Sequence, residues 1–108
     1  MAIRLLSVDV DGTLINNKNE VTEATAAALR RAMDAGIVVA LNTGRDLSES
    51  GLVLERIPGI PYLMGCTGAY LMDLRSGERL TSHAMEAGLA REVYEILRRY
   101  DVLTNVFM

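Results

Sequence analysis

Residues 3–13 read Ile3-Arg4-Leu5-Leu6-Ser7-Val8-Asp9-Val10-Asp11-Gly12-Thr13. A short apolar run that stops at Asp and Gly is typical of a strand buried in a parallel sheet, because a helix needs more residues. The apolar residues 37–41 repeat this pattern and also end in polar residues. The sequence therefore begins by predicting two neighbouring buried strands.

The rest of the chain alternates between helical and strand patterns. Ala26, Leu29 and Met33 recur at helical spacing after Thr22, a candidate N-cap. The other predicted elements are a helix over 47–56 opened by an Asp46/Glu49 capping box, a strand over 62–64, a hairpin over 65–82, a helix with the apolar stripe Leu89, Val93, Ile96, Leu97 and Tyr100, and the start of a strand over 102–108. This order argues for an α/β fold, a three-layer Rossmann-like parallel sheet with right-handed crossovers.

Candidate functional residues gather where these strands end. Ligands of open α/β sheets bind beyond the carboxyl ends of the strands. Asp9 and Asp11 follow the first strand, and Thr43 and Gly44 follow the second. This shared position predicts a binding site at one edge of the sheet.

The two carboxylates carry the chemistry. On an extended backbone, Asp9 and Asp11 point the same way, and two like charges need a compensating cation. Mg²⁺ prefers oxygen ligands, and a carboxylate can also attack phosphorus to form an aspartyl-phosphate. The alternative is an ordinary turn, since Asp-Gly is common where a strand ends.

Each neighbouring polar group has two interpretations. Gly12 permits a tight turn close to a ligand, and Thr13 either donates to a phosphate or caps the turn. Thr43 and Gly44, beside a helix start, form either an anion site or a plain capped loop. Arg45 either steers an anionic substrate or is a surface charge.

Bulk properties narrow the function. The chain has 108 residues and a formal net charge of −3, so we expect one domain and no nucleic-acid partner. No apolar stretch approaches the ~18 residues of a membrane span. Cys66 is the only cysteine, which fits a reducing cytoplasm, and without a histidine partner a catalytic thiol is not expected. We expect His83 to be structural or exposed.

Two motifs resemble a known family. Asp9-Val10-Asp11-Gly12-Thr13 resembles the first motif of the haloacid dehalogenase (HAD) superfamily phosphatases, and Asn42-Thr43-Gly44-Arg45 resembles the second. Thr67-Gly68-Ala69 is similar to a loop that often reads Asn-Gly-Ala in the Cof-type subgroup, which carries an inserted α/β cap. Thr67 departs from that pattern.

The resemblance implies roles for individual residues. Asp9 is the expected nucleophile and Asp11 the general acid and base, with Mg²⁺ held by the Asp9 carboxylate and the Asp11 backbone carbonyl. The implied phosphate-binding residues are Gly12, Thr13, Thr43 and Gly44, with weaker substrate contacts from Arg45, Thr67 and Gly68. Positioning and charge neutralisation would then drive phosphoryl transfer.

The resemblance also implies that the chain is the N-terminal part of such a protein. Residues 1–82 match the start of the HAD-like core and 83–108 the beginning of the cap. The family's lysine and further acidic metal ligands come after the cap. The edge of the strand over 3–8 would then be unpaired, which favours self-association or a longer native chain.

The expected function is Mg²⁺-dependent hydrolysis of a small phosphorylated metabolite, such as a sugar phosphate, in the cytoplasm. The alternative is a non-catalytic fragment or remnant that binds Mg²⁺ and phosphate or self-associates. A receiver-like phospho-accepting module is a third possibility, and Gly-Thr directly after Asp11 argues against it.

Overall fold

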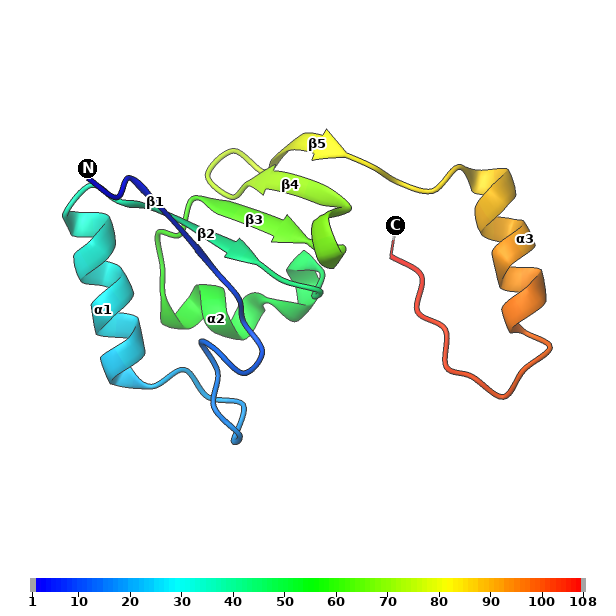
Figure 1. Cartoon of the computed structure of the whole chain (residues 1–108), viewed down its shortest axis with the longest axis horizontal. Helices are drawn as coiled ribbons and strands as arrows, with labels where there is room; N and C mark the ends of the chain where they lie inside the picture. Colours follow the sequence, from blue (N-terminus) through cyan, green and yellow to red (C-terminus); the bar gives the residue numbers. More distant parts are fainter. Residues whose placement is uncertain (1, 108) are drawn as a thin grey trace.

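The structure is a computed structural model that describes residues 2–107. Five strands in this range form one sheet in the order β1-β2-β3-β4-β5 (Figure 1). The strands are β1 (Leu5–Val8), β2 (Val38–Asn42), β3 (Tyr62–Gly65), β4 (Tyr70–Asp73) and β5 (Glu78–Ser82). The first three are parallel, and β4 and β5 are antiparallel additions. The predicted α/β fold is confirmed. The predicted hairpin is present over residues 70–82, whereas residues 65–69 belong to the end of β3 and the turn after it.

The helices are α1 (Glu23–Asp34), α2 (Gly51–Arg56) and α3 (Ala87–Leu97), with 3₁₀ turns η1 (Leu47–Glu49) and η2 (Cys66–Gly68). Thr22 caps α1 as predicted, since its Oγ1 accepts the Thr25 N–H at 3.2 Å. The predicted helix over 47–56 is interrupted at Ser50. The Ser50 hydroxyl donates to the Asp46 carbonyl at 2.9 Å, and such back-bonding bends helices.

The hydrophobic core lies on one face of the sheet. Val39, Leu41 and Leu63 are fully buried, and Leu29 of α1 and Val53 of α2 belong to the same core. Val38 and Met64, which alternate with these residues along the strands, are more than a third exposed. The helices α1 and α2 thus cover the same face (Figure 1), and residues 2–107 supply two of the three predicted layers.

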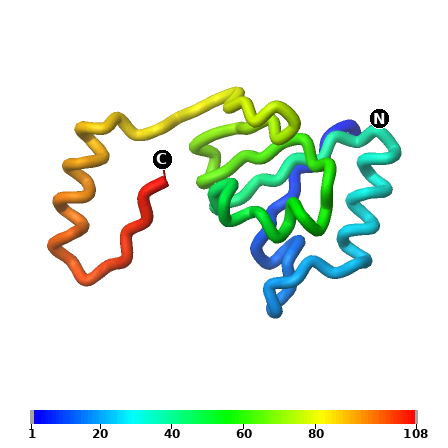
Figure 2. Tube along the Cα trace, turned by 180° about the vertical axis from the view of Figure 1, so that it is seen from behind, coloured from blue at the N-terminus to red at the C-terminus, as the bar shows by residue number. Residues whose placement is uncertain are grey.

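The C-terminal part stands away from the sheet. Figures 1 and 2 show α3 and the segment after it separated from the sheet by an extended link. The radius of gyration is 16.3 Å, against about 13 Å for a compact domain of this length. The chain therefore consists of a packed α/β unit and a loosely attached helix with its following segment.

The prediction of a strand over 102–108 is wrong for residues 102–107, which form no strand. Leu103, for example, is 92% exposed. A strand needs a neighbour to take up its backbone hydrogen bonds, and none lies beside this segment. Met108 falls outside the described residues.

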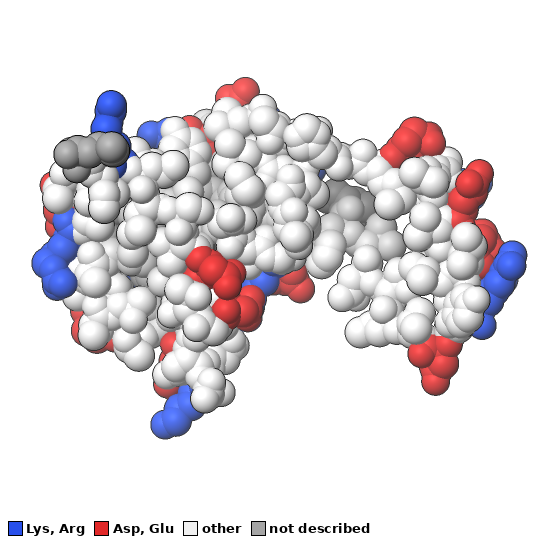
Figure 3. Space-filling model, in the orientation of Figure 1, with Lys and Arg blue, Asp and Glu red and all other residues white. Residues whose placement is uncertain are grey.

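Among residues 2–107, no helix has both the length and the apolar character required to cross a bilayer. On the face shown in Figure 3, Lys and Arg side chains are scattered and do not form one patch.

Candidate active site at the carboxyl ends of β1, β2 and β3

A pocket of about 500 Å³ opens where β1, β2 and β3 end. It is lined by Asp9, Asn42, Thr43, Gly44, Met64, Thr67 and Gly68. The parallel register sets this arrangement, because Val8 pairs with Leu41 and Asn42 pairs with Met64. The sheet edge thus brings together Asp9, Thr43 and Gly44 with the weaker candidates Thr67 and Gly68.

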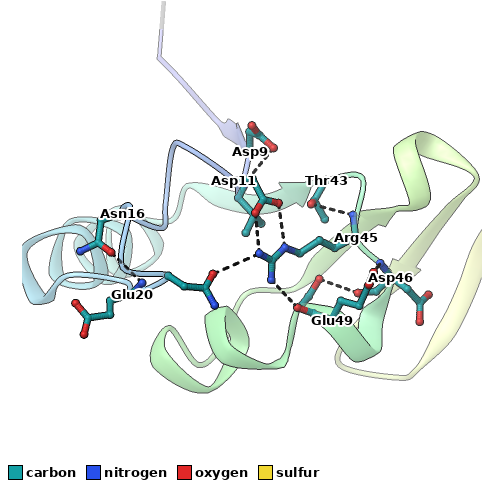
Figure 4. A network of polar contacts seen from close by, with 11 residues as sticks. Asp9, Asp11, Asn16, Glu20, Thr43, Arg45, Asp46 and Glu49 are labelled. Carbon is teal, nitrogen blue, oxygen red and sulfur yellow. Dashed lines mark hydrogen bonds and ion pairs between the residues drawn. The ribbon is translucent and has the colours of Figure 1, made fainter. Parts of the chain in front are cut away.

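The two aspartates that follow β1 have different surroundings. Asp9 lines the pocket, and its Oδ1 accepts the Val10 N–H at 2.8 Å. The fully buried Val10 lies between it and Asp11, which pairs with Arg45 (Figure 4). The chain leaves the extended conformation at Val10, so the two carboxylates do not share one partner.

Arg45 holds Asp11 in a two-pronged ion pair. Its Nε donates to Asp11 Oδ2 at 2.9 Å and its Nη2 to Asp11 Oδ1 at 2.7 Å. The same guanidinium donates to the Glu49 carbonyl at 3.0 Å, and Asn19 Oδ1 lies 3.5 Å from Nη2 (Figure 4). The two hydrogen bonds from Arg45 lower the pKa of Asp11, so the carboxyl is ionised at neutral pH, with both oxygens engaged.

The loop after β2 presents Thr43 and Gly44 to the pocket. Thr43 is only 3% exposed, and its Oγ1 accepts the Arg45 N–H at 3.1 Å. Its peptide N–H donates to the Met64 carbonyl at 3.0 Å, which fixes the loop to β3. The hydroxyl proton of Thr43 can still be donated to an anion.

Gly12 and Thr13 form the turn after Asp11 and are not among the pocket-lining residues. Gly12 has φ +75°, a conformation that glycine adopts without strain, and the Thr13 N–H donates to the Val10 carbonyl at 3.3 Å. The turn that sequence predicts is present. Phosphate contact by these two residues stays a prediction.

The loop after β3 forms the opposite wall. Cys66 and Thr67 have φ values of 49° and 56°, a left-handed conformation that is costly for residues with a side chain. Thr67 Oγ1 lies 3.4 Å from where a Cβ on Gly44 would be, which is ordinary van der Waals contact. The loop therefore lies close to Gly44.

Sequence reasoning missed several residues of this region. Asn42 and Met64 line the pocket, and Asn19 and Glu49 contact Arg45. The positions of Asn42 and Met64 at strand ends could have indicated them, whereas nothing local links Asn19 to Arg45. His83 is exposed and lines a different pocket, together with Cys66. Burial raises the pKa of the Cys66 thiol, which suits a structural role.

The oxygen atoms at this edge of the sheet are of the kind that binds Mg²⁺. Mg²⁺ is commonly held by one or two carboxylates, with waters and substrate phosphate completing its shell. Asp9 supplies an exposed carboxylate and Asp11 a backbone carbonyl in the adjacent turn. Within residues 2–107, no group of three His, Cys, Asp or Glu side chains is placed to hold a metal. The described residues can therefore supply part of a Mg²⁺ coordination shell.

Comparison with known proteins identifies relatives. The sequence pattern of the haloacid dehalogenase-like hydrolase family matches residues 6–108. The 5-amino-6-(5-phospho-D-ribitylamino)uracil phosphatase YcsE of Bacillus subtilis is 31% identical over 71 residues, which cover 66% of this chain and 28% of that protein. An HMP-PP phosphatase of Cronobacter sakazakii is 33% identical over 90 residues, covering 83% of this chain and 33% of that protein.

A solved structure shows the same arrangement of elements. A phosphatase of the HAD superfamily from Bacteroides thetaiotaomicron superposes with a TM-score of 0.78 at 29% identity, covering 92% of this chain and 36% of that one. The chain thus spans about a third of the length of these relatives.

Proposed function

Because the chain belongs to the haloacid dehalogenase-like hydrolase family, we propose that it carries the nucleophile and phosphate-binding part of a Mg²⁺-dependent phosphatase. The observation that supports this most is the shared pocket of Asp9, Thr43 and Gly44 at the carboxyl ends of parallel strands. The proposed substrate is a small phosphate ester such as a sugar phosphate. The names of the two related phosphatases, which refer to small phosphorylated metabolites, support that class.

In this proposal a carboxylate oxygen of Asp9 attacks the phosphorus atom. The bond from phosphorus to the ester oxygen breaks, and Asp11 gives that oxygen a proton. Asp11 then takes a proton from water as the water attacks the aspartyl-phosphate, which releases inorganic phosphate and restores Asp9. The Asp9 carboxylate and the Asp11 carbonyl would hold Mg²⁺, whose charge, when bound, offsets that of the phosphoryl oxygens.

The ion pair with Arg45 bears on the first proton transfer. Asp11 is ionised while both its oxygens accept hydrogen bonds from Arg45, so it cannot donate a proton in this arrangement. Arg45 is not among the pocket-lining residues, but it directly follows Thr43 and Gly44, which are. A phosphoryl group that reached the guanidinium would compete with Asp11 for it, because Arg binds phosphate and carboxylate in the same forked manner. We therefore propose that Arg45 releases Asp11 when substrate is bound, and that the released carboxylate takes up a proton from water before it acts as the general acid.

We further propose that residues 1–82 are core and 83–108 begin a cap that selects substrate. The separation of α3 from the sheet in Figure 1 supports this boundary. A second candidate function is phosphate binding without turnover, which is favoured by one observation. Arg45 already occupies both oxygens of Asp11.

Phosphate release from 4-nitrophenyl phosphate with and without Mg²⁺ tests the proposal. We expect the activity of the chain to fall by on the order of 10⁴-fold in Asp9→Asn, which keeps the shape but removes the nucleophile. Glu20→Gln is a matched control, because Glu20 is an exposed acid near the same loop. Equal activity in Asp9→Asn would overturn the proposal, and a folded, inactive wild type that binds phosphate would favour the second candidate.

A further inference from the structure

The hydroxyl of Tyr70 joins β4 to the loop that follows the second motif. Tyr70 is only 4% exposed. Its Oη accepts the Leu47 N–H at 2.9 Å and donates to Asp46 Oδ1 at 2.9 Å. The other oxygen of Asp46 accepts hydrogen bonds from Ser48 at the start of η1. A single side chain thus fixes two consecutive residues of the loop directly after Arg45.

The sheet leaves room for the Tyr70 side chain beside Gly65. Gly65 is the register partner of Tyr70 on β3, and a Cβ at Gly65 would lie 2.4 Å from Tyr70 Oη. No real Cβ contact is that short, so the phenol can cross this point only because residue 65 has no side chain. The glycine and the tyrosine form a fitted pair.

The same pair borders the strained wall of the pocket. The Cys66 N–H donates to the Arg45 carbonyl and the Thr67 N–H to the Thr43 carbonyl, each at 3.0 Å. Left-handed residues such as Cys66 and Thr67 persist only where their surroundings hold them. The loops 43–47 and 65–68 are therefore joined by backbone hydrogen bonds. Tyr70 packs against Gly65 in one loop and hydrogen-bonds to Asp46 and Leu47 in the other.

We propose that Tyr70 is a positioning residue for the phosphate pocket, holding Thr43 and Gly44 against Thr67 through its hydrogen bonds to the Asp46 carboxylate and the Leu47 N–H. The inference rests on the proposed function, because it assumes that the pocket binds phosphate. Tyr70 touches none of the reacting atoms and acts through the loop. Burial, together with the hydrogen bond to Asp46, raises the pKa of Tyr70 to about 12, so its hydroxyl proton is present at neutral pH.

A tyrosine that only filled the core would affect the whole fold equally, so the test separates local from global effects. Tyr70→Phe removes one oxygen and leaves the ring. In the ligand-free chain, we expect amide hydrogen exchange at Cys66 and Thr67 to become about tenfold faster, the effect of losing about 1.4 kcal/mol of hydrogen bonding. Exchange at Leu41 and Leu63 in the core should be accelerated much less. With Mg²⁺ present, the affinity for inorganic phosphate should fall about tenfold as well.

Two controls make the result specific. Tyr62→Phe removes a hydroxyl on neighbouring β3 that contacts Arg75, outside the pocket. Val39→Ala removes buried methyl groups from β2 and lowers global stability without touching either loop. We expect both controls to keep phosphate affinity, and neither to accelerate exchange in the loop more than in the core.

Equal acceleration at loop and core in Tyr70→Phe would overturn the positioning role, as would a loss of phosphate affinity in Val39→Ala as large as that in Tyr70→Phe. Failure of the wild-type chain to bind phosphate would instead contradict the proposed function. In that case the exchange rates, which are measured without ligand, still test whether Tyr70 holds the loop in place.

Discussion

At the scale of single residues, the pairing of Asp11 with Arg45 distinguishes two aspartates that look equivalent in sequence. The sequence pattern predicts that both aspartates serve one site. In the structure, Arg45 forms its ion pair with Asp11 and not with Asp9. Asp9 faces the pocket, whereas both oxygens of Asp11 are bound. The ion pair joins residues 34 positions apart, so no local pattern could have predicted it.

Removing Arg45 should therefore change the titration of Asp11. In Arg45→Ala, we expect the Asp11 pKa to rise from its lowered value toward 3.8, because the hydrogen bonds that favour the charged form are gone. Carboxyl carbon NMR over pH 2–6 measures it. Arg75→Ala is the matched control and should raise the pKa of Asp73, about 2 in the folded chain, without affecting Asp11. An unchanged Asp11 titration in Arg45→Ala would show that the ion pair is absent in solution.

The raised pKa of Tyr70 predicts a loss of stability in alkali. The folded chain holds the protonated phenol up to a pKa of about 12, against 10.0 for an unperturbed tyrosine. The stabilisation is complete below pH 10 and is lost as the pH rises from 10 to 12. Urea unfolding should show a smaller fall in the free energy of unfolding over this range in Tyr70→Phe than in Tyr62→Phe. Parallel curves would disprove the shift.

At the scale of elements, local chemistry predicted where helices begin better than how far they run. The capping interactions of Thr22 and of Asp46 with Glu49 are present as predicted. The break at Ser50 was not predicted, because it depends on a single hydrogen bond from the Ser50 hydroxyl to the Asp46 carbonyl. The strand predicted over 102–108 failed over 102–107 because an apolar run specifies a strand only when a partner strand exists.

The Thr22 cap should contribute measurably to stability. Thr22→Ala removes the acceptor for the Thr25 N–H, and we expect the free energy of unfolding to fall by about 1 kcal/mol. Urea denaturation measures the change, and Thr22→Ser, which keeps a hydroxyl acceptor, should restore most of it. If Thr22→Ser is as unstable as Thr22→Ala, the hydroxyl is not the source of the effect.

At the scale of the whole molecule, the β1 edge and one face of the sheet are open. β1 is one of the two edge strands, and β5 is the other. Leu5 within β1 is 58% exposed, and Ile3, which precedes the strand, is 73% exposed. Apolar edge strands pair readily with other chains. The parallel pairing of the first strands and the position of the pocket were predictable from alternating elements and strand ends, whereas the loop-to-loop contacts that shape the pocket depend on distant residues.

The open edge predicts self-association of the purified chain. Size-exclusion chromatography with light scattering should show a mass above 11.8 kDa that rises with concentration in the micromolar range. Leu5→Lys, which places a charge on the exposed edge, should shift the chain toward monomer, and Leu52→Lys on α2 should not. A clean monomer of the wild type at these concentrations would rule the edge out as an interface.

We propose above that Asp9 is the nucleophile of a phosphate site at the ends of β1, β2 and β3. Beryllium trifluoride binds carboxylates as a mimic of the phosphoryl group, so fluorine NMR with Mg²⁺ examines this claim without turnover. We expect a bound fluorine signal in the wild type and in Asp11→Asn, and none in Asp9→Asn. A bound signal that persists in Asp9→Asn would show that Asp9 is not the acceptor.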